Sequence, residues 1–129
     1  MVEKSILLVE REEGIREILH LCLHDIGGWN VVVACSDREG LEQLAIVQPK
    51  PDAIIFDILL PEEKDGYAFL KELSGRFPND LPPIVLITSL AKWFSRADMK
   101  ALGIIGAIAK PFDSRALPQE LAQLLGWSL

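Results

Sequence analysis

Four polar residues that could take part in phosphoryl chemistry follow short apolar runs in this 129-residue chain. They are Glu10, Asp57, Thr88 and Lys110. A carboxylate can accept a phosphoryl group as an acyl phosphate, and carboxylate oxygens suit a hard cation such as Mg²⁺. A hydroxyl and an ammonium group can hold phosphoryl oxygens. The four residues would form one phosphoryl-transfer site if the fold placed the ends of these runs side by side.

The apolar runs are typical of strands in a parallel sheet. They are continuous and rich in β-branched residues, as expected for strands that are buried on both faces. Ligands of such open sheets bind at the carboxyl ends of the strands, which is where the four polar residues would lie. Each of them alone is weak evidence, because Asp and Thr often end strands in water. The runs occupy residues 6–9, 31–34, 53–56, 84–87 and 104–109.

Helical patterns separate the runs. Residues 27–28, both glycine, would end the first helix, and Ser36 and Glu39 have capping-box spacing before the second. Asp65 and Asp113 could cap the third and fifth helices. This alternation predicts one α/β domain with helices on both faces of the sheet. The positions expected to face the sheet are Ile15, Ile18, Leu19, Cys22 and Ile26, then Leu41, Leu44 and Ala45, then Phe69, Leu70 and Leu73, then Phe94, Ala97, Ala101 and Leu102, and finally Leu117, Leu121, Leu124 and Leu125.

Composition argues against several classes of function. Hydrophobic residues make up 50% and charged residues 25%, which is an ordinary globular mixture. Thirteen Lys and Arg against nineteen Asp and Glu give a net charge of −6, which is unfavourable for binding a nucleic acid backbone. No apolar run approaches the roughly 20 residues of a membrane helix, and no signal peptide is evident. We expect a cytoplasmic protein whose Cys22 and Cys35 are free thiols inside the fold.

The chain resembles the receiver domain of two-component response regulators over essentially its whole length. The resemblance implies a flavodoxin-like (βα)5 fold, with five parallel strands in the order 2-1-3-4-5 and helices on both faces. It also implies a cis peptide bond between Lys110 and Pro111. The segments that carry the resemblance are Ile6-Leu-Leu-Val-Glu10, Ile15-Arg-Glu17, Pro51-Asp-Ala-Ile-Ile-Phe-Asp57, Leu60-Pro61, Asp65-Gly-Tyr67, Ile87-Thr-Ser89 and Lys110-Pro-Phe112.

Matched position by position, the resemblance implies a role for five residues. Asp57 corresponds to the phosphoacceptor, and Glu10 corresponds to an acidic residue that supports a bound Mg²⁺ through water. Leu59 corresponds to the position whose backbone carbonyl binds the metal. Thr88 corresponds to the switch hydroxyl that bonds the phosphoryl group, and Lys110 to the lysine that pairs with the phosphoryl oxygens and the site carboxylate.

Three features depart from the family's pattern. Arg11 replaces the second acidic residue, which normally binds Mg²⁺ directly. Ala107 stands where the family has a switch aromatic, so any switching would depend on Thr88 and on the loops after the third and fourth strands. The loop from Asp57 to Gly66 spans nine positions, one more than is usual in the family.

Arg11 changes the expected charge of the site. The two carboxylates of Glu10 and Asp57 are balanced by two cationic side chains, so affinity for Mg²⁺ should be reduced. Three outcomes are open. Arg11 could turn away and let Glu12 reach the metal. The guanidinium could instead take the place of the metal beside Asp57 or its phosphate. In the third outcome, phosphorylation is lost.

We therefore expect a stand-alone receiver domain over residues 1–129, with no output domain. It would take a phosphoryl group on Asp57 from a histidine kinase or a histidine phosphotransfer protein, with Mg²⁺ as a weakly bound or absent cofactor. It would not be an enzyme beyond self-catalysed phosphoryl transfer and dephosphorylation. Its output would pass to another protein through the face of the fourth helix, fifth strand and fifth helix. The alternative is a pseudo-receiver, a phosphorylation-independent interaction module that results from Arg11.

Three other interpretations are less favoured. A flavodoxin-type cofactor protein needs a phosphate-binding loop after the first strand, where the acidic residues of 10–13 would repel a phosphate. An aspartate-nucleophile hydrolase usually needs an acid close behind its nucleophile, and Ile58 and Leu59 supply none. His20 and His24 have the spacing of a zinc-binding pair, but no third ligand is visible, which favours two solvated or packed histidines.

Overall fold

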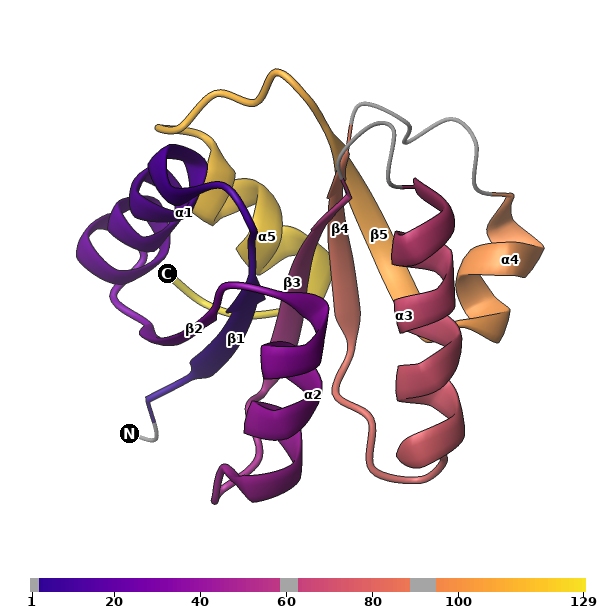
Figure 1. Cartoon of the computed structure of the whole chain (residues 1–129). Helices are drawn as coiled ribbons and strands as arrows, with labels where there is room; N and C mark the ends of the chain where they lie inside the picture. Colours follow the sequence, from indigo (N-terminus) through magenta and orange to yellow (C-terminus); the bar gives the residue numbers. More distant parts are fainter. Residues whose placement is uncertain (1–2, 59–62, 89–94) are drawn as a thin grey trace.

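The computed structural model of the chain describes residues 3–58, 63–88 and 95–129, with side chains described in these ranges except for 57, 58 and 63–67 (Figure 1). Strands and helices alternate along the chain. The elements are β1 (Ser5–Val9), α1 (Glu13–His20), η1 (Leu21–Ile26), β2 (Asn30–Ala34), α2 (Asp37–Ile46), β3 (Ala53–Ile58), α3 (Glu63–Arg76), β4 (Ile84–Thr88), α4 (Arg96–Ala101), β5 (Ile104–Ala109) and α5 (Leu117–Leu125). Within these ranges, no helix combines the length and apolar character needed to cross a membrane.

The strands form one parallel sheet in the order β2-β1-β3-β4-β5. This confirms the flavodoxin-like order that the resemblance implies. Val9, the last residue of β1, lies opposite both Ala34 of β2 and Phe56 of β3. Thr88, the last residue of β4, lies opposite Ala109, the last residue of β5. The carboxyl ends of these neighbouring strands therefore meet at one rim of the sheet.

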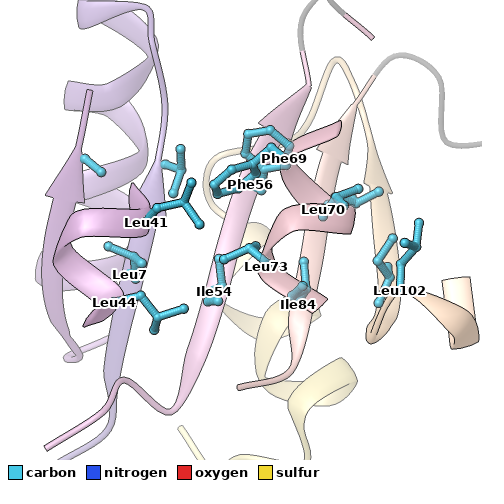
Figure 2. Close-up of a cluster of buried hydrophobic side chains, with 14 residues drawn as sticks. Leu7, Leu41, Leu44, Ile54, Phe56, Phe69, Leu70, Leu73, Ile84 and Leu102 are labelled. Carbon is cyan, nitrogen blue, oxygen red and sulfur yellow. The ribbon is translucent and has the colours of Figure 1, made fainter. Parts of the chain in front are cut away.

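Apolar side chains fill the space on both faces of the sheet. Helices α2 and α3 cover one face, while α1, η1 and α5 cover the other (Figure 1). One cluster of buried side chains lies between the sheet and helices α2 and α3. Figure 2 shows this first cluster, in which Phe56 of β3 packs against Phe69 of α3 at 4.6 Å between ring centroids. This burial on both faces explains why the strand sequences are continuously apolar. The second cluster consists of Ile6, Leu8, Leu19, Cys22, Leu23, Trp29, Ile55, Val85, Ile87, Ile108, Leu117, Leu121 and Ala122.

The first helical segment differs from the predicted pattern. Leu19 and Cys22 are buried as expected, but Ile18 and Ile26 are 46% and 55% exposed. After His20 the chain continues as the π-helix η1. A π-helix has more residues per turn than an α-helix, so side chains past this point rotate out of the 3.6-residue pattern. Leu23 therefore faces the core where the sequence predicted Ile26.

The expected apolar faces of the later helices are also only partly correct. Helix α4 begins at Arg96 and has no buried residue, so Ala97 and Ala101 are exposed. A helix of six residues has little surface to bury, and Leu102 reaches the core from just beyond it. Ala45 is exposed on α2, and Leu124 is 39% exposed near the end of α5. Phe94 lies outside the described residues.

Of the three predicted helix caps, the one at Ser36 is confirmed, whereas those at Asp65 and Asp113 are wrong. The Ser36 hydroxyl accepts a hydrogen bond from the Glu39 amide at 3.1 Å, which confirms the predicted start of α2. Asp65 is no cap, because α3 begins two residues earlier. Asp113 accepts the Arg115 amide in the turn before α5, which itself begins after Ala116. The Lys110–Pro111 peptide bond is cis, as expected.

The two cysteines are both free, but they occupy different environments. Cys22 is 2% exposed, and burial raises the pKa of its thiol. Cys35 is exposed because it follows β2 at the edge of the sheet, so the expectation that it lies inside the fold was wrong. A thiolate is the reactive form of cysteine, so Cys22 should be protected by both burial and its raised pKa.

We expect iodoacetamide to modify Cys35 alone in the native chain and both cysteines after denaturation. Intact mass would count the added groups at mildly alkaline pH. The matched control is Cys35→Ser, which should take up no label until it is unfolded. Rapid native labelling of that variant would show that Cys22 is less protected than its burial indicates.

Gly27 and Gly75 offer a matched test of the packing. A Cβ atom on Gly27 would lie 2.7 Å from the Leu23 carbonyl oxygen and 2.7 Å from the Trp29 ring, whereas one on Gly75 would meet nothing within 4 Å. Gly27→Ala should therefore lower the free energy of unfolding by about 1–3 kcal/mol through overpacking. Gly75→Ala in α3 should raise it by about 0.4–1 kcal/mol, because the unfolded chain loses conformational freedom. Urea unfolding measures both, and equal effects would contradict this account.

Candidate functional site

Glu10 is a fully buried acid at the carboxyl end of β1. Its amide donates a hydrogen bond to the Ala34 carbonyl at 3.0 Å, which continues the pairing of β1 with β2. One carboxylate oxygen, Oε1, accepts the Glu12 amide at 3.0 Å as the chain turns toward α1. A charge buried among apolar strands is costly unless polar groups or ions compensate it. The rim around Glu10 is therefore suited to cationic or hydrogen-bond-donating partners.

The backbone brings the predicted site residues to this same rim. Val9 and Phe56 are paired, so Glu10 and Asp57 follow them on strands about 4.8 Å apart. Thr88 is fully buried at the end of β4, and its carbonyl accepts the Lys110 amide at 3.1 Å. Four strand ends thus carry the two acids, the hydroxyl and the lysine. The side chain of Asp57 and the whole of Leu59 lie outside the described residues.

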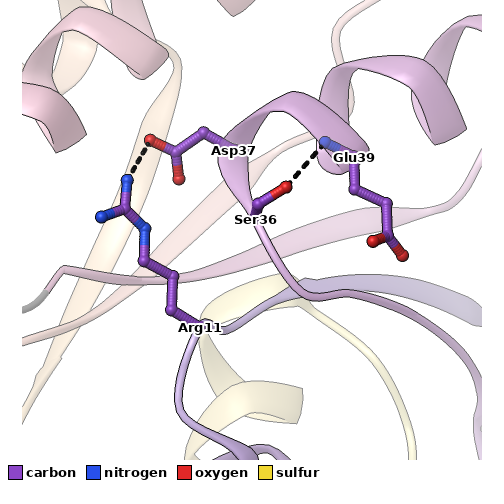
Figure 3. A network of polar contacts seen from close by, with 4 residues as sticks. All are labelled: Arg11, Ser36, Asp37 and Glu39. Atoms are coloured by element: carbon purple, nitrogen blue, oxygen red, sulfur yellow. Dashed lines mark hydrogen bonds and ion pairs between the residues drawn. The ribbon is translucent and has the colours of Figure 1, made fainter.

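Arg11 forms an ion pair that sequence reasoning did not anticipate. Its Nη2 atom lies 3.0 Å from Oδ2 of Asp37, which is in the first turn of α2 (Figure 3). The side chains are 37% and 19% exposed, respectively. A signal was present, because Asp37 follows the second apolar run, whose carboxyl end lies at the same rim. The sequence pattern here points to Ser36 and Glu39 as a helix cap, and Asp37 between them was not singled out.

The ion pair changes the charge around the rim. The expected set of Glu10, Asp57, Arg11 and Lys110 was neutral. Asp37 adds a carboxylate beside Arg11, so the enlarged set carries a net charge of −1. The rim is therefore electrostatically more favourable for a divalent cation than the sequence alone suggested.

Arg16 is a second residue that the sequence did not single out. Its Nη1 donates hydrogen bonds to the carbonyls of Glu10 at 3.2 Å and Arg11 at 3.3 Å. These bonds tie the chain after β1 to α1. Glu12 is exposed at the N-terminus of α1, and its side chain makes no capping hydrogen bond. Arg16 thus fixes the backbone from which both Glu10 and Arg11 project.

The donor set partly fits a magnesium site. Glu10 supplies a hard carboxylate, the ligand type that Mg²⁺ prefers. Among the side chains that the structure describes, no three His, Cys, Asp or Glu residues are close enough together to hold a metal ion. That includes His20 and His24, whose rings stack at 5.4 Å between centroids. The other two ligands that the sequence analysis predicts, the Asp57 carboxylate and the Leu59 carbonyl, lie outside the part of the chain that the structure describes.

A cleft of about 620 Å³ opens between α2 and α3, next to the rim. Arg11 and Asp37 both line it, and apolar Leu41 and Phe69 contribute to its wall. The side chain of Arg11 therefore extends from the loop after β1 toward this cleft.

The chain matches the family model of the response regulator receiver domain over residues 6–122. It belongs to the response regulator receiver family. Receiver domains are signalling domains and are generally not enzymes, and in general they bind Mg²⁺ in an acidic pocket. Apart from Ser5, the match covers every strand of the sheet, and it includes Glu10, Asp57, Thr88 and Lys110.

Curated relatives and solved structures support this assignment. Response regulator Rre1 of Synechocystis is 31% identical over 94% of this chain, and the phosphate regulon regulatory protein PhoB of Pseudomonas aeruginosa is 31% identical over 97%. The match with this chain covers about half the length of these relatives, 51% of Rre1 and 53% of PhoB. Chemotaxis protein CheY4 of Vibrio cholerae superposes with a TM-score of 0.76 at 26% identity, covering 95% of this chain and 99% of that one. A putative response regulator from Chloroflexus aurantiacus gives 0.75 at 29% identity, covering 97% and 99%.

The Arg11–Asp37 pair should contribute little to stability, because both side chains are partly exposed. A double-mutant cycle with Arg11→Ala and Asp37→Ala should give a coupling free energy of about 0.2–1 kcal/mol at low ionic strength. The coupling should fall as salt is added, because screening shortens the range of the interaction. Urea unfolding of the four proteins would measure it. A coupling well above this range, or one unaffected by salt, would mean that the pair is more deeply buried in solution.

Proposed function

We propose that this receiver domain takes a phosphoryl group on Asp57 and signals through protein contacts. The observation that carries the proposal is the backbone position of Asp57. It follows Phe56 on the central strand β3, with Glu10 at the end of β1 on one side and Thr88 at the end of β4 on the other. Acceptor, acid and hydroxyl thus lie on adjacent strand ends.

The chemistry is transfer of a phosphoryl group from a phosphohistidine. An Asp57 carboxylate oxygen attacks phosphorus, an O–P bond forms, and the N–P bond to the imidazole breaks with the electron pair going to nitrogen. Thr88 would donate a hydrogen bond to a phosphoryl oxygen, and the Lys110 ammonium would balance its charge. Mg²⁺, when bound by Glu10, Asp57 and the Leu59 carbonyl, would offset the negative charge on the transferring group.

The donor would be a histidine kinase or a histidine phosphotransfer protein in the cytoplasm. The proposed output surface is the face of α4, β5 and α5. Ile105 of β5 is 45% exposed and Leu124 of α5 is 39% exposed, which gives this face an apolar character suited to a protein partner. Ala107 of β5 is half-buried and carries no ring, so switching would depend on Thr88 and the neighbouring loops.

A second candidate function is that of a phosphorylation-independent interaction module. The specific observation in its favour is the guanidinium of Arg11 at the position of an acidic metal ligand. The guanidinium forms an ion pair with Asp37 at 3.0 Å, which holds it beside the start of α2. In this case Asp57 would never be modified, and the receiver domain would bind its partner constitutively.

Acetyl phosphate distinguishes the two functions. We expect incubation with Mg²⁺ to add one phosphoryl group to the chain, seen by intact mass and removed by hydroxylamine as expected for an acyl phosphate. Asp57→Asn should abolish the increment, because the acceptor carboxylate is gone. Omitting Mg²⁺ shows whether the chain still needs the ion when Arg11 is present.

Arg11→Asp is the matched variant that restores an acid at the family position. An increment in Arg11→Asp but not in the wild type would favour the interaction module and attribute it to Arg11. Labelling that persists in Asp57→Asn would remove Asp57 from its proposed role.

A further inference from the structure

We infer that Asp37 is a positioning residue that holds the Arg11 guanidinium at α2 and thereby sets the affinity of the rim for a divalent cation. The inference rests on the proposed function, because it concerns the same site. It deepens that function because it gives α2, through Asp37, a role in cation binding that the sequence analysis did not assign to this helix.

The position of Arg11 creates the need for such a residue. Arg11 is adjacent in sequence to Glu10, the buried acid of the rim. An arginine side chain is long and permanently charged, so it could extend either toward the rim acids or away from them. In the structure its Nη2 lies 3.0 Å from Asp37 Oδ2, and both residues line the cleft between α2 and α3 (Figure 3).

The backbones on both sides of this ion pair are fixed. Arg16 donates hydrogen bonds to the carbonyls of Glu10 and Arg11. On the other side, Ser36 caps α2 through the Glu39 amide. The ion pair therefore joins two backbone segments that are each held in place, and it restrains the guanidinium at the α2 side.

Removal of the Asp37 charge would have two effects on a cation at the rim. The first is the loss of one negative charge near the rim, an effect that removal of any other acid at a similar distance would also have. The second is specific, because an Arg11 released from Asp37 is attracted to the rim acids and opposes the cation there. At separations below a Debye length of about 10 Å, one such charge can change divalent affinity by roughly 3- to 10-fold.

The test is a divalent-cation titration of the whole chain without any phosphoryl donor. Mg²⁺ affinity would be measured by the shifts of the Glu10 and Glu12 amide resonances, and Mn²⁺ broadening of the same resonances would localise the ion. Asp37→Asn should weaken binding by roughly 3- to 10-fold, whereas Asp37→Glu, which keeps the carboxylate, should bind within about twofold of the wild type. Glu39→Gln removes a charge from the same helical turn and should also stay within about twofold.

The decisive comparison adds Arg11→Ala. In that background Asp37→Asn should have no more effect than Glu39→Gln has in the wild type, because there is no guanidinium to release. An equal effect of Asp37→Asn with and without Arg11 would overturn the inference. So would the absence of cation binding at Glu10 in all of these proteins. Asp37→Glu is the folding control. A folded spectrum and wild-type cation affinity in this variant would show that substitution at position 37 does not by itself damage the fold.

This result is separable from that of the proposed function. Acetyl phosphate labelling of Asp57 together with an Arg11-independent effect at position 37 would leave the phosphoacceptor role standing and overturn this inference. If the cation affinities are as predicted but acetyl phosphate does not label the chain, this inference stands and the phosphoacceptor role of Asp57 is overturned.

Discussion

The parallel pairing of β1 with β3 is the constraint on which this molecule depends. Both strands are buried on their two faces, so polar side chains are tolerated only where the strands end. The register opposes Val9 to Phe56, and the next residue on each strand is an acid. Glu10 and Asp57 therefore lie on neighbouring strand ends, where the continuously apolar sequences stop. The same pairing on the other side of β3 brings Thr88 to the rim.

That constraint also explains why Arg11 matters more than an ordinary surface substitution. Arg11 places a permanent positive charge one step beyond Glu10. A cation so close to a buried carboxylate changes the electrostatic environment of that carboxylate, and an acid that pairs with the cation moderates this change. Asp37, from the first turn of α2, supplies a carboxylate at 3.0 Å. Charge around the rim is thus distributed over β1 and α2 together, and the local sequence after β1 describes only half of it.

The sequence predicts the strands, their order and the start of α2 because these depend on burial and on local hydrogen bonds. Ser36 and Glu39 are three residues apart, and their capping contact needs nothing else. Side-chain exposure on the helices is less predictable, since it depends on helix geometry and length. Ile26 is exposed because the helix becomes a π-helix. Asp37 meets Arg11 across 26 positions of sequence, and such a contact follows only from the packed fold.

Under the proposed function, Arg11 and Ala107 would give this receiver domain a particular way of sensing charge. Without a ring at Ala107, a phosphoryl group on Asp57 could not be coupled to β5 through an aromatic side chain. The group would add close to two negative charges to the rim, and the Arg11 guanidinium, one residue past the buried Glu10, is a natural partner for phosphoryl oxygens. Any movement of Arg11 toward the rim weakens its contact with Asp37 and so changes the charge at the start of α2. The surface that would register phosphorylation first is then the cleft between α2 and α3, which the proposed output face on α4, β5 and α5 would complement.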